Sequence, residues 1–452
     1  MQKITGAQER RADAIVVGGG LAGLVAAATL AQGGVDVVLL EKSNHAGGRA
    51  ITETLEGGYH FNMGPHALYR KGAAQRILKE LGVKWSGGLP PTKGGHVIYR
   101  GQKFLSPLGT TQLLLTGLLS FREKLEAARL LSSLGKIDTE SLDRVSLSEW
   151  LDSVTKSERV RQLMMTIVRV TTYSHDAERT SAGAALAQVR LGLAGNVDYL
   201  DNGWQTLVDG ALEVARQAGA KVLTDASVIS IKRDAEGYTL HLRSGETYRA
   251  SAVILATSPQ AALKMVERGG ETILRAWAEE SLPVKAACLD VALKRLPQTS
   301  SGLFALGIDR PLYCIVHSAS AHLAPEGGAV IHVMKNHETG EAADARADRR
   351  ELEELLDLVQ PGWREVVAHT RFLPSITVSN ALVTAARGGT SGRPTASVPG
   401  FDNLYVAGDW VGAEGMLLDA AVASAHHAAL ALLQSRSAAR PEFQRQPERL
   451  IA

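Results

Sequence analysis

Three glycines near the N-terminus have the spacing of a phosphate-binding turn. Gly18, Gly20 and Gly23 form the pattern GxGxxG in the segment GGGLAG. In such a turn the first glycine permits a tight bend, the second lets the backbone approach a pyrophosphate, and the third allows close packing of helix on strand. The first helical N–H groups, at Leu21 and Ala22, would face the anion. The predicted chemistry is dinucleotide binding.

A carboxylate follows at a suitable distance. Glu41 lies at the end of the next expected strand, where it can accept hydrogen bonds from both hydroxyls of a ribose. A basic residue would be expected there for a ribose 2′-phosphate, so NADP is disfavoured. Gly47, Gly48 and Arg49 can close over the pyrophosphate from the other side, through backbone N–H groups and a cation. The alternatives are a solvated strand-end charge and an ordinary surface loop.

A βαβ unit must hold these residues, and the surrounding sequence predicts one. Residues 14–17 and 35–40 are short, β-branched apolar runs typical of parallel strands buried on both faces. Apolar and small residues recur at helical spacing over 21–32, and Gly33 and Gly34 supply the stop. The glycine pattern alone also occurs in unrelated α/β proteins, but strands, helix and carboxylate together favour dinucleotide binding.

Beyond this unit the chain alternates between two kinds of pattern. Helical periodicity dominates 71–199 and predicts a separate helical lobe. Strand patterns return after Gly203, first in the nucleotide-binding lobe and then, from about 282 to 383, in the other lobe. Expected helices cover 73–81, 122–134, 147–153, 158–170, 206–217, 348–359 and 419–433, and expected strands cover 221–223, 227–232, 238–243, 252–256, 286–293, 329–334 and 403–407.

Composition disfavours several classes of protein. With 452 residues, 45% hydrophobic and 21% charged, the chain resembles an average globular protein large enough for two lobes. A formal charge of +2 predicts no nucleic-acid partner. Cys288 and Cys314 lack the spacing of a disulfide framework or metal site, and the N-terminus lacks a secretory signal. We therefore predict no metal and a cytoplasmic location.

The segment 18–50, GGGLAGLVAAATLAQGGVDVVLLEKSNHAGGRA, resembles the glycine-rich and GGR signature of the FAD-dependent amine oxidase, phytoene desaturase and protoporphyrinogen oxidase superfamily. The resemblance implies FAD rather than NAD, because NAD dehydrogenases lack the GGR extension. The segment NLYVAGDW at 403–410 resembles the second flavin motif of that superfamily, in which an acidic residue, here Asp409, contacts the ribitol. Because no cysteine lies beside this motif, the implied FAD is non-covalent.

The implied fold class is α/β. A Rossmann-type FAD-binding domain, with a glutathione-reductase-like βαβ unit and a parallel sheet, would be interleaved with an α+β substrate domain and a helical lobe. We assign 12–70, 200–265 and 396–434 to a discontinuous FAD-binding domain, 71–199 and 266–395 to the substrate-binding domain with its helical lobe, and 1–11 and 435–452 to flexible termini.

The resemblance assigns roles to further residues. The helix after Asp409 would direct its N-terminal dipole at the flavin N1–C2=O edge and stabilise the anion formed on reduction. The loop 64–66 would run near the flavin ring. Without the resemblance, Asp409 could be a helix cap and Ser424 a packing residue. Cofactor contacts are further implied for Lys42, Gly64, Pro65, His66, Val228 (at the adenine), Gly408, Met416, Leu417 and Ala420.

Two side chains are candidates for catalysis. His66 can donate a hydrogen bond in the active site, although an isolated histidine more often packs or caps a loop. Lys285 aligns with the flavin-facing lysine of amine oxidases, although a strand-edge charge is the simpler interpretation. Leu417 stands where an amine oxidase tyrosine is expected. AGDW followed by DAAVAS instead resembles the plant-type phytoene desaturase and hydroxysqualene oxidoreductase branch, which implies an apolar substrate.

The predicted reaction is dehydrogenation, or desaturation, of an apolar small molecule by hydride transfer to flavin N5, with oxygen or a quinone as acceptor. One alternative is a flavin amine oxidase that releases hydrogen peroxide. A non-catalytic flavin-binding protein and an NAD-only dehydrogenase are further alternatives. The residues do not indicate an oligomeric state.

An uncharged stretch, FLSPLGTTQLLLTGLLS at 104–120, stands apart from these motifs. Pro107, Gly109 and Gly117 interrupt it, so it does not fit a membrane-spanning helix. In desaturase-like and porphyrinogen-oxidising relatives, the helical lobe forms an apolar tunnel and can dip into a membrane surface. We expect either ordinary core helices or peripheral contact with a membrane.

Overall fold

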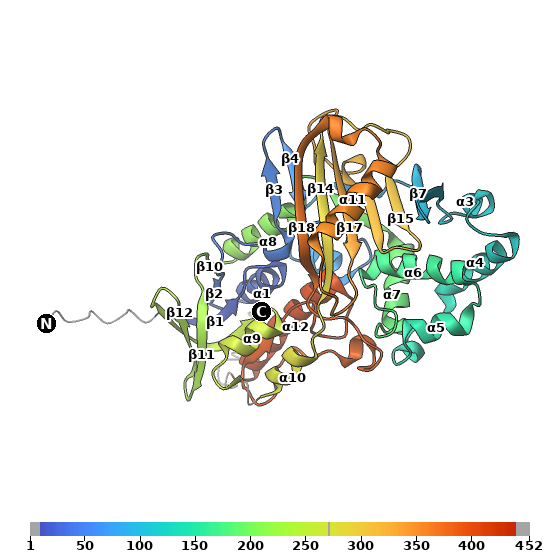
Figure 1. Cartoon of the computed structure of the whole chain (residues 1–452). Helices are drawn as coiled ribbons and strands as arrows, with labels where there is room; N and C mark the ends of the chain where they lie inside the picture. Colours follow the sequence, from blue (N-terminus) through green and yellow to red (C-terminus); the bar gives the residue numbers. More distant parts are fainter. Residues whose placement is uncertain (1–9, 270–271, 440–452) are drawn as a thin grey trace, which may run out of the picture.

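A computed structural model describes residues 10–269 and 272–439 of the chain. Two seven-stranded sheets form two lobes, and a group of helices extends from the second lobe (Figure 1). Neighbouring strands of each sheet come from distant parts of the sequence, so the chain passes between the lobes several times.

The first sheet holds the N-terminal βαβ unit. Its order is β10-β2-β1-β13-β12-β11, with β19 beside β13. β1 pairs in parallel with β2 and β13, whereas β12 and β11 are antiparallel additions at one edge. The strands are β1 (Arg10–Val17), β2 (Val37–Leu40), β10 (Lys221–Leu223), β11 (Val228–Asp234), β12 (Gly237–Leu242), β13 (Thr247–Leu255) and β19 (Leu404–Val406).

Burial on both faces explains the apolar sequence of the central strands. All four residues of β2, VVLL, are buried. α1 (Leu21–Gln32) joins β1 to β2 over the predicted residues and ends at Gly33. On one face of the sheet, α1 packs against α8 (Gln205–Gln217) and α12 (Leu417–Ala439). Toward the other face lie α9 (Pro259–Met265) and α10 (Ile273–Glu280).

α12 is the central helix of this core. By length and composition alone it could cross a membrane, but half of its most apolar window is buried inside the protein. Its residues Val422, Ala425 and Leu432 pack in the same core as α1. The apolar character of α12 is therefore explained by its packing. α2 (Ala73–Glu80) also contacts α12 and so belongs with the first lobe.

The second sheet has the order β18-β14-β17-β16-β15-β7-β8. Along β14, Ala287 and Leu289 pack with α11 (Ala345–Val359), whereas Ala286 and Cys288 lie on the opposite face. The strands are β7 (Gly95–Tyr99), β8 (Gln102–Leu105), β14 (Val284–Leu293), β15 (Phe304–Gly307), β16 (Leu312–Val316), β17 (Ala329–Asn336) and β18 (Val367–Ser379).

The predicted helical lobe is present. Ser120 and Ser146 begin its second and third helices with capping boxes, in which Glu123 and Glu149 return the hydrogen bond. The helices are α3 (Thr110–Leu115), α4 (Phe121–Ser133), α5 (Leu147–Val154), α6 (Glu158–Thr172) and α7 (Ala182–Gly195).

The segment 71–199 also contains strands that helical periodicity did not predict. β7 and β8 form a hairpin at the edge of the second sheet. Its two turn residues, Arg100 and Gly101, have φ of 48° and 75°, as a type I′ turn requires. Smaller sheets join β3 (Thr52–Leu55) to β4 (Tyr59–Asn62), and β5 (Leu68–Tyr69) and β6 (Gly87–Gly88) to β9 (Val197–Leu200).

The predicted flexible termini are partly in regular structure. Residues 10–11 belong to β1 and 435–439 to α12, because strand pairing and helix packing continue beyond the boundaries that composition indicated. The rest of both predictions, 1–9 and 440–452, lies outside the described residues.

Candidate active site

The N-terminal glycine turn has the geometry of an anion cradle. Gly18 has a φ of +109°, and a Cβ at Gly23 would lie 1.9 Å from the carbonyl oxygen of Gly18. The bend and the close helix approach therefore each require glycine. A Cβ at Gly20 would meet only the carbonyl oxygen of Gly47, at 4.0 Å. The space in front of Gly20 is open, as a pyrophosphate needs.

The start of α1 offers unpaired N–H groups to that space. Gly20 is the N-cap of α1, and no side chain caps the helix. The GGR segment lies across the turn: Gly47 N–H donates to Gly19 O at 2.8 Å, and a Cβ at Gly48 would lie 3.4 Å from Gly20 Cα. Two backbone segments thus border one anion site.

Glu41 is buried and faces the same turn. Its Oε2 accepts from Gly19 N–H at 2.6 Å and its Oε1 from Ser43 N–H at 2.8 Å. Next to it lies an open hollow of about 550 Å³, and Ser227, one of its lining residues, precedes Val228. The two segments predicted for the ribose and the adenine therefore meet. The hollow is lined by Lys42, Ser43, Asp225, Ser227, Arg243 and Ser244.

Asp409 connects the C-terminal motif to the GGR segment. Its Oδ2 accepts from Arg49 Nη1 at 2.8 Å and from Asn380 N–H at 3.0 Å, and its Oδ1 from Asn380 Nδ2 at 2.8 Å. Burial alone would raise the pKa of Asp409, but the charge of Arg49 and these hydrogen bonds hold it below its ordinary value. Glu41 binds Gly19, Gly47 also binds Gly19, and Asp409 binds Arg49, so a chain of contacts through the turn and the GGR segment joins the two carboxylates.

Ser424 holds the loop that carries Asp409. The Ser424 hydroxyl accepts from Gly408 N–H at 3.0 Å and lies 3.0 Å from the Gly408 carbonyl oxygen. Ser424 is therefore a packing residue that holds the backbone at Gly408 in place. Leu417, at the start of α12, has a φ of 54°, which is uncommon for leucine. Its side chain packs against a small cluster that contains Met416.

A buried acid lies in the first turn of α12. Asp419 Oδ1 accepts from Ala74 N–H at 2.8 Å, whereas Oδ2 has no hydrogen-bond partner among the described residues. Burial raises the pKa of Asp419 to about 6, the hydrogen bond from Ala74 acts in the opposite direction, and the charge of Glu414 raises it further. The ionised form of Asp419 therefore destabilises the fold.

Asp419→Asn is expected to increase the free energy of unfolding at neutral pH by about 3 kcal/mol, because a shift of about two pKa units has that value. The penalty is present above about pH 6 and disappears as pH falls toward the unfolded-state pKa, near 4. Urea unfolding at about pH 7 and about pH 4.5 tests this. The difference in unfolding free energy between the wild type and the variant should fall from about 3 kcal/mol at the higher pH to about 1 kcal/mol at the lower one. A gap of equal size at both would contradict the assignment.

His66 joins the loop 64–66 to the GGR segment. Its Nδ1 lies 3.0 Å from Gly64 O and its Nε2 3.2 Å from Arg49 O. Its ring meets Trp204 edge-on with centroids 4.6 Å apart. Burial lowers the pKa of His66 to about 4, so its imidazole is neutral near pH 7. A neutral imidazole donates through one nitrogen, so His66 braces one of the two carbonyls.

The loop 64–66 lies against the inner face of the second sheet. A Cβ at Gly64 would lie 2.9 Å from Cys288 Sγ. The Tyr173 hydroxyl, at the end of α6, donates to Pro65 O at 3.2 Å. Around these contacts is an apolar and aromatic cluster, made of Ala286, Cys288, Met334, Tyr173, Tyr313, Leu373, Ile376 and Val378.

Two tyrosines that the sequence analysis missed border this cluster. The hydroxyl oxygens of Tyr199 and Tyr313 lie 3.3 Å apart. Burial raises the pKa of Tyr199 to about 12 and that of Tyr313 well above its ordinary value, so both phenols are neutral. The Tyr313 side chain is half-buried. The sequence of β16, LYCIV, predicts a strand, but its pattern does not indicate which face of that strand is turned toward the cofactor lobe, so Tyr313 could not be recognised from it.

Lys285 lies away from this face. Its side chain is exposed, and along β14 it is in register with the α11 side, to which Ala287 and Leu289 belong. Cys288, on the opposite side, contacts the loop 64–66 instead. The geometry therefore gives no support to a catalytic Lys285, and the strand-edge interpretation fits it better.

A buried ion pair holds the loop and the sheet together. Arg371 donates to Asp290 Oδ2 through Nε at 3.0 Å and Nη2 at 2.7 Å, and His332 Nδ1 lies 2.6 Å from Asp290 Oδ1. Arg371 also donates to the carbonyl oxygen of Asn62, two residues before Gly64. Asp290 and His332 are fully buried. These residues position the loop 64–66.

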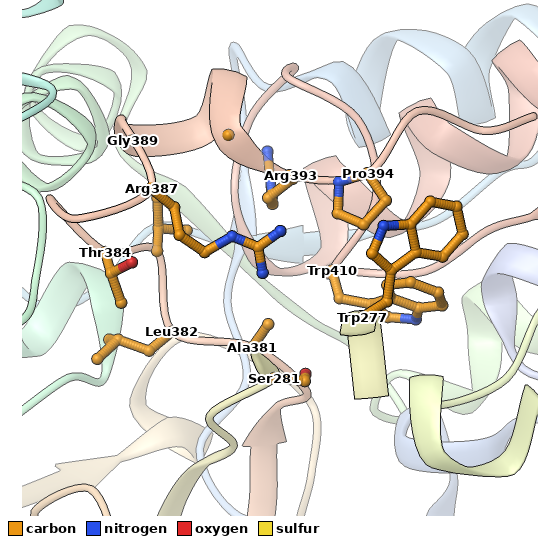
Figure 2. Close-up of a pocket in the computed structure, with 12 residues that line it drawn as sticks. Trp277, Ser281, Ala381, Leu382, Thr384, Arg387, Gly389, Arg393, Pro394 and Trp410 are labelled. Atoms are coloured by element: carbon orange, nitrogen blue, oxygen red, sulfur yellow. The ribbon is translucent and has the colours of Figure 1, made fainter. Parts of the chain in front are cut away.

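A small cavity lies behind the C-terminal motif. Figure 2 shows Trp277 and Trp410 side by side at one edge and the Arg387 side chain reaching toward them. The cavity volume is about 10 Å³, which is on the scale of one water molecule. Arg393, also on its wall, donates to the carbonyl oxygen of Asp409 at 3.2 Å. Arg393 thus helps to hold the backbone at Asp409, and the cavity itself is too small for a substrate.

Comparison of the sequence with known proteins identifies a family and several relatives. The family described as flavin containing amine oxidoreductase matches residues 21–433. A Mycobacterium tuberculosis protein named as a flavin-containing monoamine oxidase, AofH, is 31% identical over 264 residues, 55% of this chain and 57% of that protein. A phytoene desaturase of Neurospora crassa is 40% identical over 75 residues, 17% of this chain and 13% of that protein. This chain thus spans little more than half the length of AofH and much less of the desaturase.

Solved structures share the whole fold. A putrescine oxidase triple mutant superposes with a TM-score of 0.75 at 16% identity, covering 95% of this chain and 100% of that one. At this identity the likeness concerns the fold alone. Both lobes and the helical extension thus occur together in a known architecture.

Proposed function

Since this chain belongs to the flavin containing amine oxidoreductase family, we propose that it dehydrogenates a neutral, predominantly apolar small molecule. The chain is an FAD-dependent oxidoreductase. When bound, FAD supplies the two-electron acceptor that takes up hydride from a substrate C–H bond. The protein's part is to orient that bond in a space from which water is excluded. Oxygen or a quinone is the proposed final acceptor.

The residues present fit FAD. The uncapped start of α1 and the open space at Gly20 suit the pyrophosphate, and Glu41 beside the hollow suits the ribose. Asp409, which pairs with Arg49 of the GGR segment, and the start of α12 would hold the ribitol and the ring.

The proposal of a neutral, apolar substrate rests on the side chains of the second sheet that face the loop 64–66. Cys288 and Ile376 lie beside Gly64 of the loop 64–66, Met334 packs in the same apolar cluster, and Tyr199 and Tyr313 add neutral phenols. The nearby carboxylates of Asp290 and Asp409 are each paired with an arginine. A cationic substrate would find these negative charges already neutralised, so the face favours a neutral, apolar molecule.

An amine oxidase is the second candidate. AofH is named as a monoamine oxidase, and the tyrosines of the inner face offer aromatic surface on which a neutral amine can pack. Against it, Leu417 stands where a tyrosine would be expected, and Lys285 is on the other side of the sheet.

Anaerobic bleaching of the bound flavin separates these candidates. We expect isoprenoid, porphyrinogen or polyketide compounds to reduce the flavin, and primary and secondary amines to leave it oxidised. Lys285→Met should bleach at the wild-type rate, because Lys285 lies away from the loop 64–66.

Bleaching by amines alone, with release of peroxide in air, would replace the proposal with the amine oxidase. If none of the compounds reduced the flavin while dithionite did, a non-catalytic flavin-binding role would be favoured.

A further inference from the structure

Four of the nine tyrosines in the chain gather beside the inner face of the second sheet. They come from four separate elements, namely Tyr69 from β5, Tyr173 from the end of α6, Tyr199 from β9 and Tyr313 from β16. Burial raises the pKa of Tyr69, Tyr173 and Tyr313, and interaction with Tyr199 raises each of them further. The four phenols are therefore neighbours, and we call them the tyrosine cluster.

The tyrosine cluster contacts two segments that the flavin ring is expected to meet. The Tyr173 hydroxyl donates to Pro65 O, in the loop 64–66, at 3.2 Å. Burial raises the pKa of Tyr69, and the charge of Asp419, in the first turn of α12, raises it further. The cluster thus lies beside both the loop and the start of α12.

Strand pairing places Tyr313 on the same face of the sheet as the loop 64–66. Tyr313 is paired with Met334, and Met334 is paired in turn with Cys288. Residues directly opposite one another on neighbouring strands share a face. A Cβ at Gly64 would lie 2.9 Å from Cys288 Sγ, so this face meets the loop. Tyr313 therefore lies on the substrate side of the sheet.

The hydroxyl hydrogens of the cluster do not all have acceptors. Tyr69 and Tyr173 each donate to a backbone carbonyl oxygen, at 2.9 Å and 3.2 Å. The hydroxyl oxygens of Tyr199 and Tyr313 lie 3.3 Å apart and have no other hydrogen-bond partner among the described residues. A phenol carries one hydrogen, and one hydrogen bond between two phenols uses only one of their two hydrogens. One O–H group of this pair is therefore unused.

Burial indicates which of the two hydroxyls is available. Tyr199 is buried, and its ring packs against that of His317 with centroids 4.1 Å apart. The Tyr313 side chain is half-buried and so has surface that a bound molecule can touch. We therefore assign Tyr199 as the donor to Tyr313. The O–H of Tyr313 is then the unused one, and a donor in such surroundings is costly to leave without an acceptor.

We propose that Tyr313, supported by Tyr199, donates a hydrogen bond to a carbonyl oxygen of the substrate. The neighbouring side chains of Cys288, Met334 and Ile376 offer only apolar surface and weak acceptors. A carbonyl accepts the free O–H and brings no hydrogen of its own, whereas the hydrogen of a hydroxyl or an amine would need a further acceptor. The inference rests on the proposed function and narrows its substrate to an apolar molecule that carries a carbonyl group.

Titration of the FAD-loaded protein with matched probes tests the inference. The ketones α-tetralone and cyclohexanone are compared with tetralin and cyclohexane, the hydrocarbons of the same ring systems, and flavin absorbance reports binding. Tyr313→Phe should weaken the binding of the ketones about tenfold and leave that of the hydrocarbons unchanged, because it removes one hydrogen bond. The infrared carbonyl stretch of bound α-tetralone should lie at a lower frequency in the wild type than in this variant.

Two further variants show that the effect belongs to the unused hydroxyl. Tyr69→Phe is the matched control, because the Tyr69 hydroxyl already donates to Thr171 O. The same chemical change within the same cluster should then leave the binding of all four probes unchanged. Tyr199→Phe should weaken ketone binding only about threefold, since Tyr313 keeps its O–H and loses only the neighbour that polarises it.

Ketone binding and a carbonyl stretch that Tyr313→Phe leaves unchanged would overturn the inference, and so would an equal loss of ketone binding in Tyr69→Phe. The proposed function would survive either result as long as the hydrocarbons bind. If none of the four probes changed the spectrum of the folded, flavin-loaded wild type, both the inference and the proposed apolar substrate would fail.

Discussion

Gly20→Val is expected to yield a folded, soluble protein without flavin. Gly20 has φ −71° and ψ 176°, which valine adopts without strain, and a Cβ there would meet only Gly47 O at 4.0 Å. The side chain would instead occupy the space in front of α1, where the pyrophosphate must lie. We expect FAD affinity to fall about 100-fold or more, equivalent to about 2.7 kcal/mol. Flavin absorbance per protein and the unfolding midpoint measure both effects.

Gly23→Val is the contrasting change within the same motif. Its Cβ would lie 1.9 Å from the carbonyl oxygen of Gly18, so the strand and helix cannot both keep their positions. This variant should lose soluble expression rather than flavin alone. Gly20→Val that remained yellow with normal affinity would show that the pyrophosphate binds elsewhere.

Arg371→Met is expected to lower the free energy of unfolding by about 3–5 kcal/mol, because it leaves the buried Asp290 carboxylate without its cation. Arg371 makes two hydrogen bonds to Asp290, whose side chain has no exposed surface, one to Asn62 O and one to Glu53. Methionine keeps the apolar stem, so the change removes the charge and the donors. Urea unfolding of the holoprotein measures the effect.

Arg364→Met is the matched control for this prediction. Arg364 pairs with Asp357 and Glu353 at the surface, where its side chain is 49% exposed. Such a pair contributes less than about 1 kcal/mol. If the two variants were destabilised equally, burial would not explain the importance of Arg371.

Both predictions concern the elements on which the active site depends. The glycine turn and GGR segment form the anion site, and the Asp290–Arg371 pair keeps the loop 64–66 on the inner face of the second sheet. Loss of the first should remove the cofactor. Loss of the second should leave FAD in place but loosen the substrate side.

The local sequence was sufficient to predict the structure of the N-terminal nucleotide-binding unit. The turn, α1 and the strands on either side of it depend on contacts within about thirty residues, where glycine spacing, β-branched runs and helical periodicity have direct structural meaning. α1 accordingly spans the predicted residues. The motif at 403–410 also carried its own signal, although only folding brings Asp409 to Arg49, 360 positions earlier.

The substrate side was decided by tertiary structure. Along β14, a change of one residue moves a side chain to the other face, so Lys285 and Cys288 could not be ranked until the pairing of β14 with β17 and β18 was known. Tyr199 and Tyr313 come from different strands, and their contact depends on how the lobes pack. Leu114 and Leu115, in the stretch 104–120, are exposed because the helical lobe buries other residues of that stretch. Such properties depend on contacts distant in sequence, which local patterns do not specify.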